Sequence, residues 1–189
     1  YIYENFVHEI YEYLQDKPLP IGNSYAELQE QLDSLVLNVD YGEAHSPFEE
    51  TVNGVVYRLE ENPMGWKWFQ LQFQGDEGTL TYENKRGVKS IGFGCNRFKK
   101  GVFPETHYYD KQVGVPANRS LNCMVDGSWT EEKKLLLRVY ITDSSLGSCF
   151  ITFGFKGKEV GLMMNKRAEF FLDDYMGYAG GEQALGEVE

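Results

Sequence analysis

The stretch FQLQFQ (residues 69–74) decides the fold class, because apolar and polar residues alternate in it without interruption. Side chains of a β-strand point alternately to its two faces, so this pattern predicts a strand with one buried and one solvated face. The same period of two recurs after residue 53. We expect strands at about 55–60, 69–74, 78–83, 88–93, 120–128, 134–142, 148–156 and 159–164.

The connections between these strands are mostly short and carry glycine, as at Gly75, Gly87 and Gly157. Short links join antiparallel neighbours, because a parallel crossover needs a dozen or more residues. An open sheet of eight strands would leave two exposed edges. We therefore predict a mainly all-β fold, an antiparallel up-and-down barrel of about eight strands.

The chain outside these strands divides into further segments. YIYENFVHEIYEYL places apolar residues at helical spacing, and Ser24 with Glu27 forms a capping box that predicts a second helix. A short C-terminal helix is expected at 166–178, and an insertion at 95–119 is expected to fold over one barrel end. The predicted organisation is a helical lead and connector at 1–37, a linker at 38–52, the barrel at 53–178 and a loose tail at 179–189.

Composition restricts the partners. The 189 residues carry a net charge of −11, which argues against nucleic acid because a phosphate backbone would be repelled. No apolar run approaches the roughly 18 residues that span a membrane. The chain begins at Tyr1 without a leader, so we expect a fragment or a processed piece.

The three cysteines, Cys95, Cys123 and Cys149, form no Cys-x-x-Cys pair. An odd count cannot close completely, and a core of this size needs no disulfide, so buried thiols are expected. A Cys123–Cys149 bridge stays open as an alternative. The compartment stays open, with a cytoplasmic location slightly favoured over an extracytoplasmic one.

Tyr82-Glu83-Asn84 matches a Tyr-x-Asn triplet, which is one of three short signatures of penicillin-recognising serine hydrolases. Such an enzyme also needs Ser-x-x-Lys on a helix, and no serine of this chain has a lysine three residues on. Tyr3-Glu4-Asn5 repeats the triplet by chance. We therefore interpret residues 82–84 as the start of a hairpin turn, and expect this chain to be non-catalytic.

The sequence gives little indication of a metal site or of hydrolysis by paired carboxylates. His8, His45 and His107 are far apart and show no metal-ligand spacing, so no metal and no cofactor is expected. A paired-carboxylate hydrolase stays open, but neighbouring acids on a strand point to opposite faces. The adjacent acidic pairs are Glu60-Glu61, Glu131-Glu132 and Asp173-Asp174.

One aromatic cluster is a candidate ligand site or domain interface. It consists of Trp66, Trp68, His107, Tyr108 and Tyr109. Exposed together, these side chains would suit a sugar, a peptide or a partner domain. The alternative is that the two tryptophans plug one end of the barrel, since large aromatic side chains are mostly buried.

Several longer stretches resemble a known family. VNGVVYRLEENPMGW, GCNRFKKGVFP, GSWTEEKKLLLRVYITD and ITFGFKGKEVGLMMNKRAEFFLDDYMGYAGG resemble the C-terminal region of bacterial serine hydrolases related to class C β-lactamases and penicillin-binding proteins. LPIGNSYAELQEQLDSLVL resembles the connector that precedes that region. The resemblance implies a lipocalin-like or streptavidin-like barrel, with the catalytic residues in a preceding domain.

Two functions follow as expectations. The first is a non-catalytic accessory or interaction domain, whose partner would be the catalytic serine-hydrolase domain of the parent chain. The alternative is a lipocalin-like module that binds a small apolar or sugar ligand in the barrel mouth.

Overall fold

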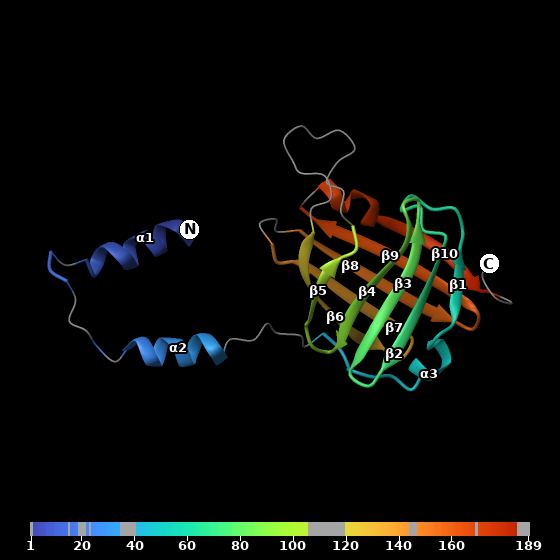
Figure 1. Cartoon of the computed structure of the whole chain (residues 1–189), viewed down its shortest axis with the longest axis horizontal. Coiled ribbons are helices and arrows are strands. Elements are labelled where there is room, and N and C mark those ends of the chain that lie inside the picture. The colour runs from blue at the N-terminus through green and yellow to red at the C-terminus, as the bar shows by residue number, and fades with distance from the viewer. Residues whose placement is uncertain are drawn as a thin grey trace. The chain divides into compact units, whose positions relative to one another are not determined.

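Ten strands form one continuous sheet within the described part of the chain (Figure 1). The computed structural model describes residues 2–14, 16–18, 22, 24–34, 41–105, 120–143, 147–168 and 170–184. The strands are β1 (Val56–Leu59), β2 (Trp68–Gln74), β3 (Glu77–Asn84), β4 (Gly87–Cys95), β5 (Lys99–Phe103), β6 (Leu121–Glu131), β7 (Lys134–Ile141), β8 (Ser148–Lys156), β9 (Glu159–Arg167) and β10 (Gly177–Gln183).

The sheet closes on itself. Its order is β4-β3-β2-β1-β10-β9-β8-β7-β6-β5, and each of these neighbouring pairs is antiparallel. A parallel contact of β4 with β6, at Gly94↔Asp126 and Cys95↔Gly127, joins the two ends. The predicted closed antiparallel barrel is confirmed, with nine strands in the wall and β5 as an extra strand beside β6.

Two strands lie where the sequence predicts none. β5 falls inside the predicted insertion 95–119, and the residues of that insertion from 106 onward lie outside the described ones. β10 begins at Gly177, inside the predicted helix 166–178. It continues to Gln183, so residues 179–183 of the tail that is predicted to be loose form a strand of the barrel wall. The sequence GYAGGEQ does not indicate this strand, because it contains three glycines and glycine is a poor strand former.

Short helical turns lie at the two ends of the barrel (Figure 1). The helix α3 (Glu49–Val52) forms in the predicted linker 38–52, and its Val52 side chain is buried. The predicted C-terminal helix is only the 3₁₀ segment η1 (Phe170–Tyr175), because β9 continues to Arg167 and β10 starts at Gly177.

The chain divides into two units, and residues 1–37 form the first. This unit contains α1 (Ile2–Glu12) and α2 (Ser24–Ser34), at the positions where helices are predicted. Phe6 and Ile10 of the apolar stripe of α1 are exposed. No described helix is long and apolar enough to cross a membrane.

Aromatic side chains fill the end of the barrel next to η1. The ring of Trp66 stacks on Tyr82 at 3.8 Å between centroids, and the ring of Tyr175 meets Trp66 edge-on. The hydroxyl groups of Tyr82 and Tyr175 are hydrogen-bonded to each other. Glu105 Oε1 accepts hydrogen bonds from Tyr175 (3.0 Å) and from Asn84 Nδ2 (2.7 Å). This end therefore carries a buried polar network among aromatic side chains.

The middle and the opposite end are packed in the same way. Phe69 lies 4.8 Å from Phe153, and Phe73 lies 5.9 Å from Trp129, between ring centroids. Phe93 needs two inward glycines around it, because a Cβ atom on Gly78 would lie 2.2 Å from its ring and one on Gly127 would lie 2.7 Å from it. Complementary sizes across facing positions are what a dense interior requires.

The Tyr-x-Asn triplet is a hairpin feature, as predicted. Tyr82 and Asn84 belong to β3, and the backbone N–H of Arg86 donates to Asn84 Oδ1 (2.8 Å) in the turn before β4. Lys85 and Arg86 then bind the carboxylate of Asp174. The triplet closes a turn against η1.

All three cysteines are free and buried, so the alternative Cys123–Cys149 bridge is wrong. Burial raises the pKa of the Cys95 and Cys123 thiols to about 11. The Cys149 thiol is fully buried and its pKa is raised further. Since the thiolate is the reactive form, these thiols are suited to packing.

Trp129 tests the packing at the α3 end. Its side chain is 2% exposed and contacts Phe73 and Phe155. We expect Trp129→Ala to lower the free energy of unfolding by about 3–5 kcal/mol, since a large cavity would remain. Urea denaturation measures this loss, and a change near zero would contradict the packing described.

Candidate functional site

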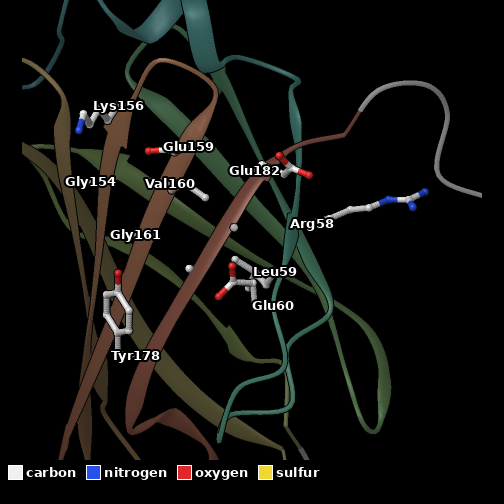
Figure 2. Close-up of a pocket in the computed structure, with 12 residues that line it drawn as sticks. Arg58, Leu59, Glu60, Gly154, Lys156, Glu159, Val160, Gly161, Tyr178 and Glu182 are labelled. Carbon is white, nitrogen blue, oxygen red and sulfur yellow. The ribbon is translucent and has the colours of Figure 1, made fainter.

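A groove of about 550 Å³ lies on the outer wall of the barrel, over β8, β9, β10 and β1 (Figure 2). This volume lies in the range of ordinary small-ligand sites. The lining residues are Arg58, Leu59, Glu60, Gly154, Lys156, Glu159, Val160, Gly161, Tyr178, Gly180, Gly181 and Glu182. They come from four adjacent strands and the residue that follows β1, so the groove is part of the rigid wall.

Three glycines make the floor of the groove. Gly154 pairs with Gly161 across β8 and β9, and Gly161 pairs with Gly180 across β9 and β10. Gly154 and Gly161 each lie between two buried residues, and Gly180 follows the buried Ala179, so the three occupy the outward positions of their strands. A Cβ atom on Gly154 would meet nothing within 4 Å. The groove exists because side chains are missing from a row where other outward positions carry them.

A row of charges borders the floor on one side. The pairing register places Lys156 opposite Glu159, Glu159 opposite Glu182, and Glu182 opposite Arg58. All four side chains are exposed, and none forms a salt bridge with another described residue. Two carboxylates directly opposite each other repel, so this row favours a ligand that brings hydrogen-bond donors.

Tyr178 and Glu60 border the remaining sides. Tyr178 pairs with Met163, and both side chains are exposed on the outer wall. The Tyr178 hydroxyl reaches over the floor, to 3.5 Å from the Cβ position of Gly161. The carboxylate of Glu60 lies 3.2 Å from the Cβ position of Gly180. Polar atoms therefore converge on the floor from two sides.

The groove is lined mainly by glycine backbone, charged side chains and the phenol group of Tyr178. Its lining residues include no serine, cysteine, threonine or histidine that could act as a nucleophile. A carboxyl pair that performs acid–base hydrolysis needs two different environments. Glu159 and Glu182 are both exposed, so their environments are alike.

The predicted aromatic cluster is not one surface. Trp66 is buried and closes the η1 end of the barrel, as the alternative interpretation predicts. Trp68 lies on the outer face, half-buried, and its Nε1 donates to Glu83 Oε2 at 2.8 Å. The remaining members, His107, Tyr108 and Tyr109, lie outside the described residues.

The groove residues were missed at the sequence level. A signal was present, because FGF (153–155) and VGL (160–162) each place a glycine between buried positions, and AGG (179–181) places one after the buried Ala179. From the sequence alone, however, glycine is taken as a sign of turns between strands. The third glycine belongs to β10, which the sequence does not predict, so the row could not be assembled.

Three solved structures are similar in fold. A fatty-acid-binding protein from brain tissue of Drosophila melanogaster aligns with a TM-score of 0.46 at 12% identity, over 70% of this chain and 99% of its own. The fatty-acid-binding protein of Manduca sexta gives 0.41 at 12% identity, over 71% and 99%. The REP1-NXSQ fatty acid transporter gives 0.43 at 8% identity, over 74% and 99%. No protein-family model and no curated protein matches this chain.

The resemblance to the C-terminal region of β-lactamase-related serine hydrolases is wrong. No family model for such a region matches the chain, and the three similar structures are proteins named for fatty-acid binding or transport. The stretches that carried the resemblance are mostly barrel hairpins. Alternating apolar residues with glycine turns are common to antiparallel barrels, so they carry little information about a particular family.

Gly154→Val tests the open floor. Valine at an outward strand position without neighbours should raise the free energy of unfolding by about 0.5–1 kcal/mol, because it lowers the entropy of the unfolded chain and favours the strand. Gly181→Ala is the matched contrast, since its Cβ would lie 2.4 Å from the carbonyl oxygen of Arg58 and should destabilise the barrel. Loss of stability in Gly154→Val would contradict the open groove.

Proposed function

We propose that this chain is a non-enzymatic binding module, which takes a small, flat, hydroxyl-rich ligand such as a sugar ring in the groove on its outer wall. The observation that carries the proposal is the glycine row Gly154–Gly161–Gly180, bordered by polar side chains. Glycine within strands often marks a place where a ligand approaches the backbone closely.

The chemistry of the groove favours such a ligand. The carboxylates of Glu60, Glu159 and Glu182 accept hydrogen bonds from hydroxyl groups, and Arg58 and Lys156 donate them. The floor without side chains admits a flat ring, and the exposed ring of Tyr178 adds an apolar face with a polar tip. A small number of polar groups around a flat apolar surface is typical of small-molecule sites.

The interior supports the groove rather than the barrel mouth as the binding surface. Rings of Phe69, Phe153, Trp66 and Tyr82 occupy the described interior. A fatty-acid carboxylate in this interior would also meet the buried carboxylate of Glu105. Lys89 Nζ lies 3.8 Å from Glu105 Oε2, so a fatty-acid carboxylate buried there would have to share this cation with Glu105, which would be costly.

The ligand prediction is tested by NMR. Mono- and disaccharides at up to about 10 mM, which is ten times a millimolar dissociation constant, should shift the backbone amides of Gly154, Gly161 and Gly180. Gly154→Val should abolish these shifts while leaving the protein folded, because the valine fills the floor. Gly101→Val on β5 is the control, since it places the same side chain outside the groove.

Two outcomes would contradict the proposed site. One is the absence of shifts with every saccharide tested. The other is a response to a fatty acid such as oleate at the interior residues Phe69 and Phe153, with the groove amides unchanged.

The absence of catalysis is also a proposal. The hydroxyl group of Ser128, which lies beside Asp126, is within donating distance of Asp126 Oδ2 (3.3 Å) and Asn96 Oδ1 (3.2 Å), and no serine has a lysine three residues on. We expect no turnover of nitrocefin or of simple esters by this chain. Turnover that a single serine substitution removes would refute this.

A further inference from the structure

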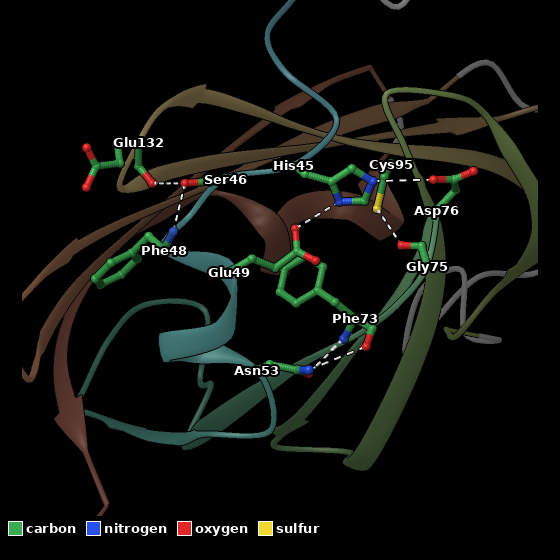
Figure 3. Close-up of polar contacts among 10 residues, drawn as sticks. All are labelled: His45, Ser46, Phe48, Glu49, Asn53, Phe73, Gly75, Asp76, Cys95 and Glu132. Atoms are coloured by element: carbon green, nitrogen blue, oxygen red, sulfur yellow. Dashed lines mark hydrogen bonds and ion pairs between the residues drawn. The ribbon is translucent and has the colours of Figure 1, made fainter.

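His45 lies on a strap, residues 41–52, which runs beside β6 and ends in α3 (Figure 3). The backbone of Glu43 exchanges two hydrogen bonds with Trp129, at 2.9 and 2.8 Å. Ser46 Oγ donates to the carbonyl oxygen of Glu132 at 2.6 Å. These contacts hold the first half of the strap to β6 and the following turn.

The second half of the strap closes the barrel end. The ring of Phe48 lies 5.7 Å from that of Phe155, and Val52 is buried. Phe155 in turn lies beside Trp129, whose Nε1 is buried without a hydrogen-bond partner among the described residues. Asn53 anchors the far end of α3, because its Oδ1 accepts the backbone N–H of Phe73 at 2.9 Å. The α3 segment is thus a cover between two fixed points.

The imidazole of His45 joins this cover to the barrel. Nδ1 lies 3.2 Å from Glu49 Oε2 on α3, and Nε2 lies 3.3 Å from Asp76 Oδ1 in the turn between β2 and β3 (Figure 3). A neutral imidazole has one N–H donor and one acceptor, whereas the imidazolium has two donors. Because both partners are carboxylates, only the protonated ring satisfies both contacts.

Other charged and titratable groups surround this contact. The neighbouring elements contribute Glu49 of α3, Asp76 and Glu77 from the β2–β3 hairpin, the Cys95 thiol of β4, and Arg97 and Lys99 beyond it. Glu77 is engaged by Lys99 (2.5 Å) and by Arg97 (3.4 Å). The two carboxylates closest to the imidazole are therefore Glu49 and Asp76.

We propose that His45 is a proton-operated latch, which holds α3 over the aromatic barrel end when the imidazole is protonated and releases it when the proton leaves. Release breaks the bridge between α3 and the β2–β3 turn and leaves the ties at Ser46 and Asn53. The cover then opens between those ties, over Phe155 and Trp129. This device acts at the barrel end and is independent of the groove.

The pH at which the latch opens depends on whether folding raises or lowers the pKa of His45. The hydrogen bonds to Glu49 and Asp76 raise the pKa of His45 above its ordinary value near 6.5, against the opposing effect of partial burial. A group whose pKa is higher in the folded state stabilises that state fully below its unfolded pKa. The latch is therefore closed below about pH 6.5 and opens as the pH rises through the higher folded-state pKa.

Hydrogen exchange of the indole N–H groups tests the latch. Trp129 reports on the α3 end, and Trp66, which is also buried without a partner for Nε1, reports on the η1 end. The ratio of their exchange rates, Trp129 over Trp66, cancels the intrinsic effect of pH on indole exchange. From about pH 5 to about pH 8.5 this ratio should rise about three- to tenfold, as expected for two exposed ion pairs.

Two substitutions test whether the contacts of His45 cause the pH dependence of this ratio. His45→Gln should raise the ratio at about pH 5 to the value that the unchanged protein reaches at about pH 8.5, and should remove the pH dependence. Asp76→Asn should leave a smaller pH dependence, because the Glu49 contact remains. The proposal fails if the ratio is constant with pH in the unchanged protein, or if His45→Gln retains the full rise.

Discussion

Closure of the sheet is the constraint on which the rest of this structure depends. Only two residue pairs, Gly94↔Asp126 and Cys95↔Gly127, join β4 to β6. The chain must turn sharply after β4 to make room for β5, and Asn96 does so with a positive φ of 49° while its N–H donates to Gly127 at 2.7 Å. Asparagine tolerates this left-handed conformation better than most residues. Without this contact the wall would end in two unpaired edges.

A buried ion pair lies beside the closure, on the outer wall. Arg138 Nη2 donates to Asp126 Oδ2 at 2.6 Å, and both side chains are almost fully buried. The ring of Tyr41, on the strap, lies 3.8 Å from the guanidinium carbon. Burial raises the pKa of Asp126, while Arg138 lowers it. The pair ties β6 to β7 where β6 also receives β4, so the strap, the closing contact and the charge pair form one structural unit.

The sequence predicts most strands of the barrel wall, but it does not predict β5 and β10. Strict alternation in segments such as 69–74 and 148–156 identifies strands, because burial of one face forces a period of two. KKGVF of β5 is too short to show a period, and GYAGGEQ of β10 lacks β-branched residues, so both depend on pairing with neighbours that are distant in sequence. Since the groove needs β10, it could not be assembled from the sequence. His45 and Glu49 have visible helical spacing, whereas Asp76 joins them only through the closed fold.

The two barrel ends respond differently to protons, and this follows from what closes each of them. At the η1 end, burial raises the pKa of Tyr82 and Tyr175 well above its ordinary value of about 10, so their hydroxyl groups stay neutral across the physiological range. At the α3 end, the closing group is an imidazole, which titrates near neutrality. A change of pH between about 6 and 8 therefore leaves one end unaltered and changes the charge at the other. Because the barrel wall is closed, motion at the α3 end need not disturb the opposite end or the outer groove.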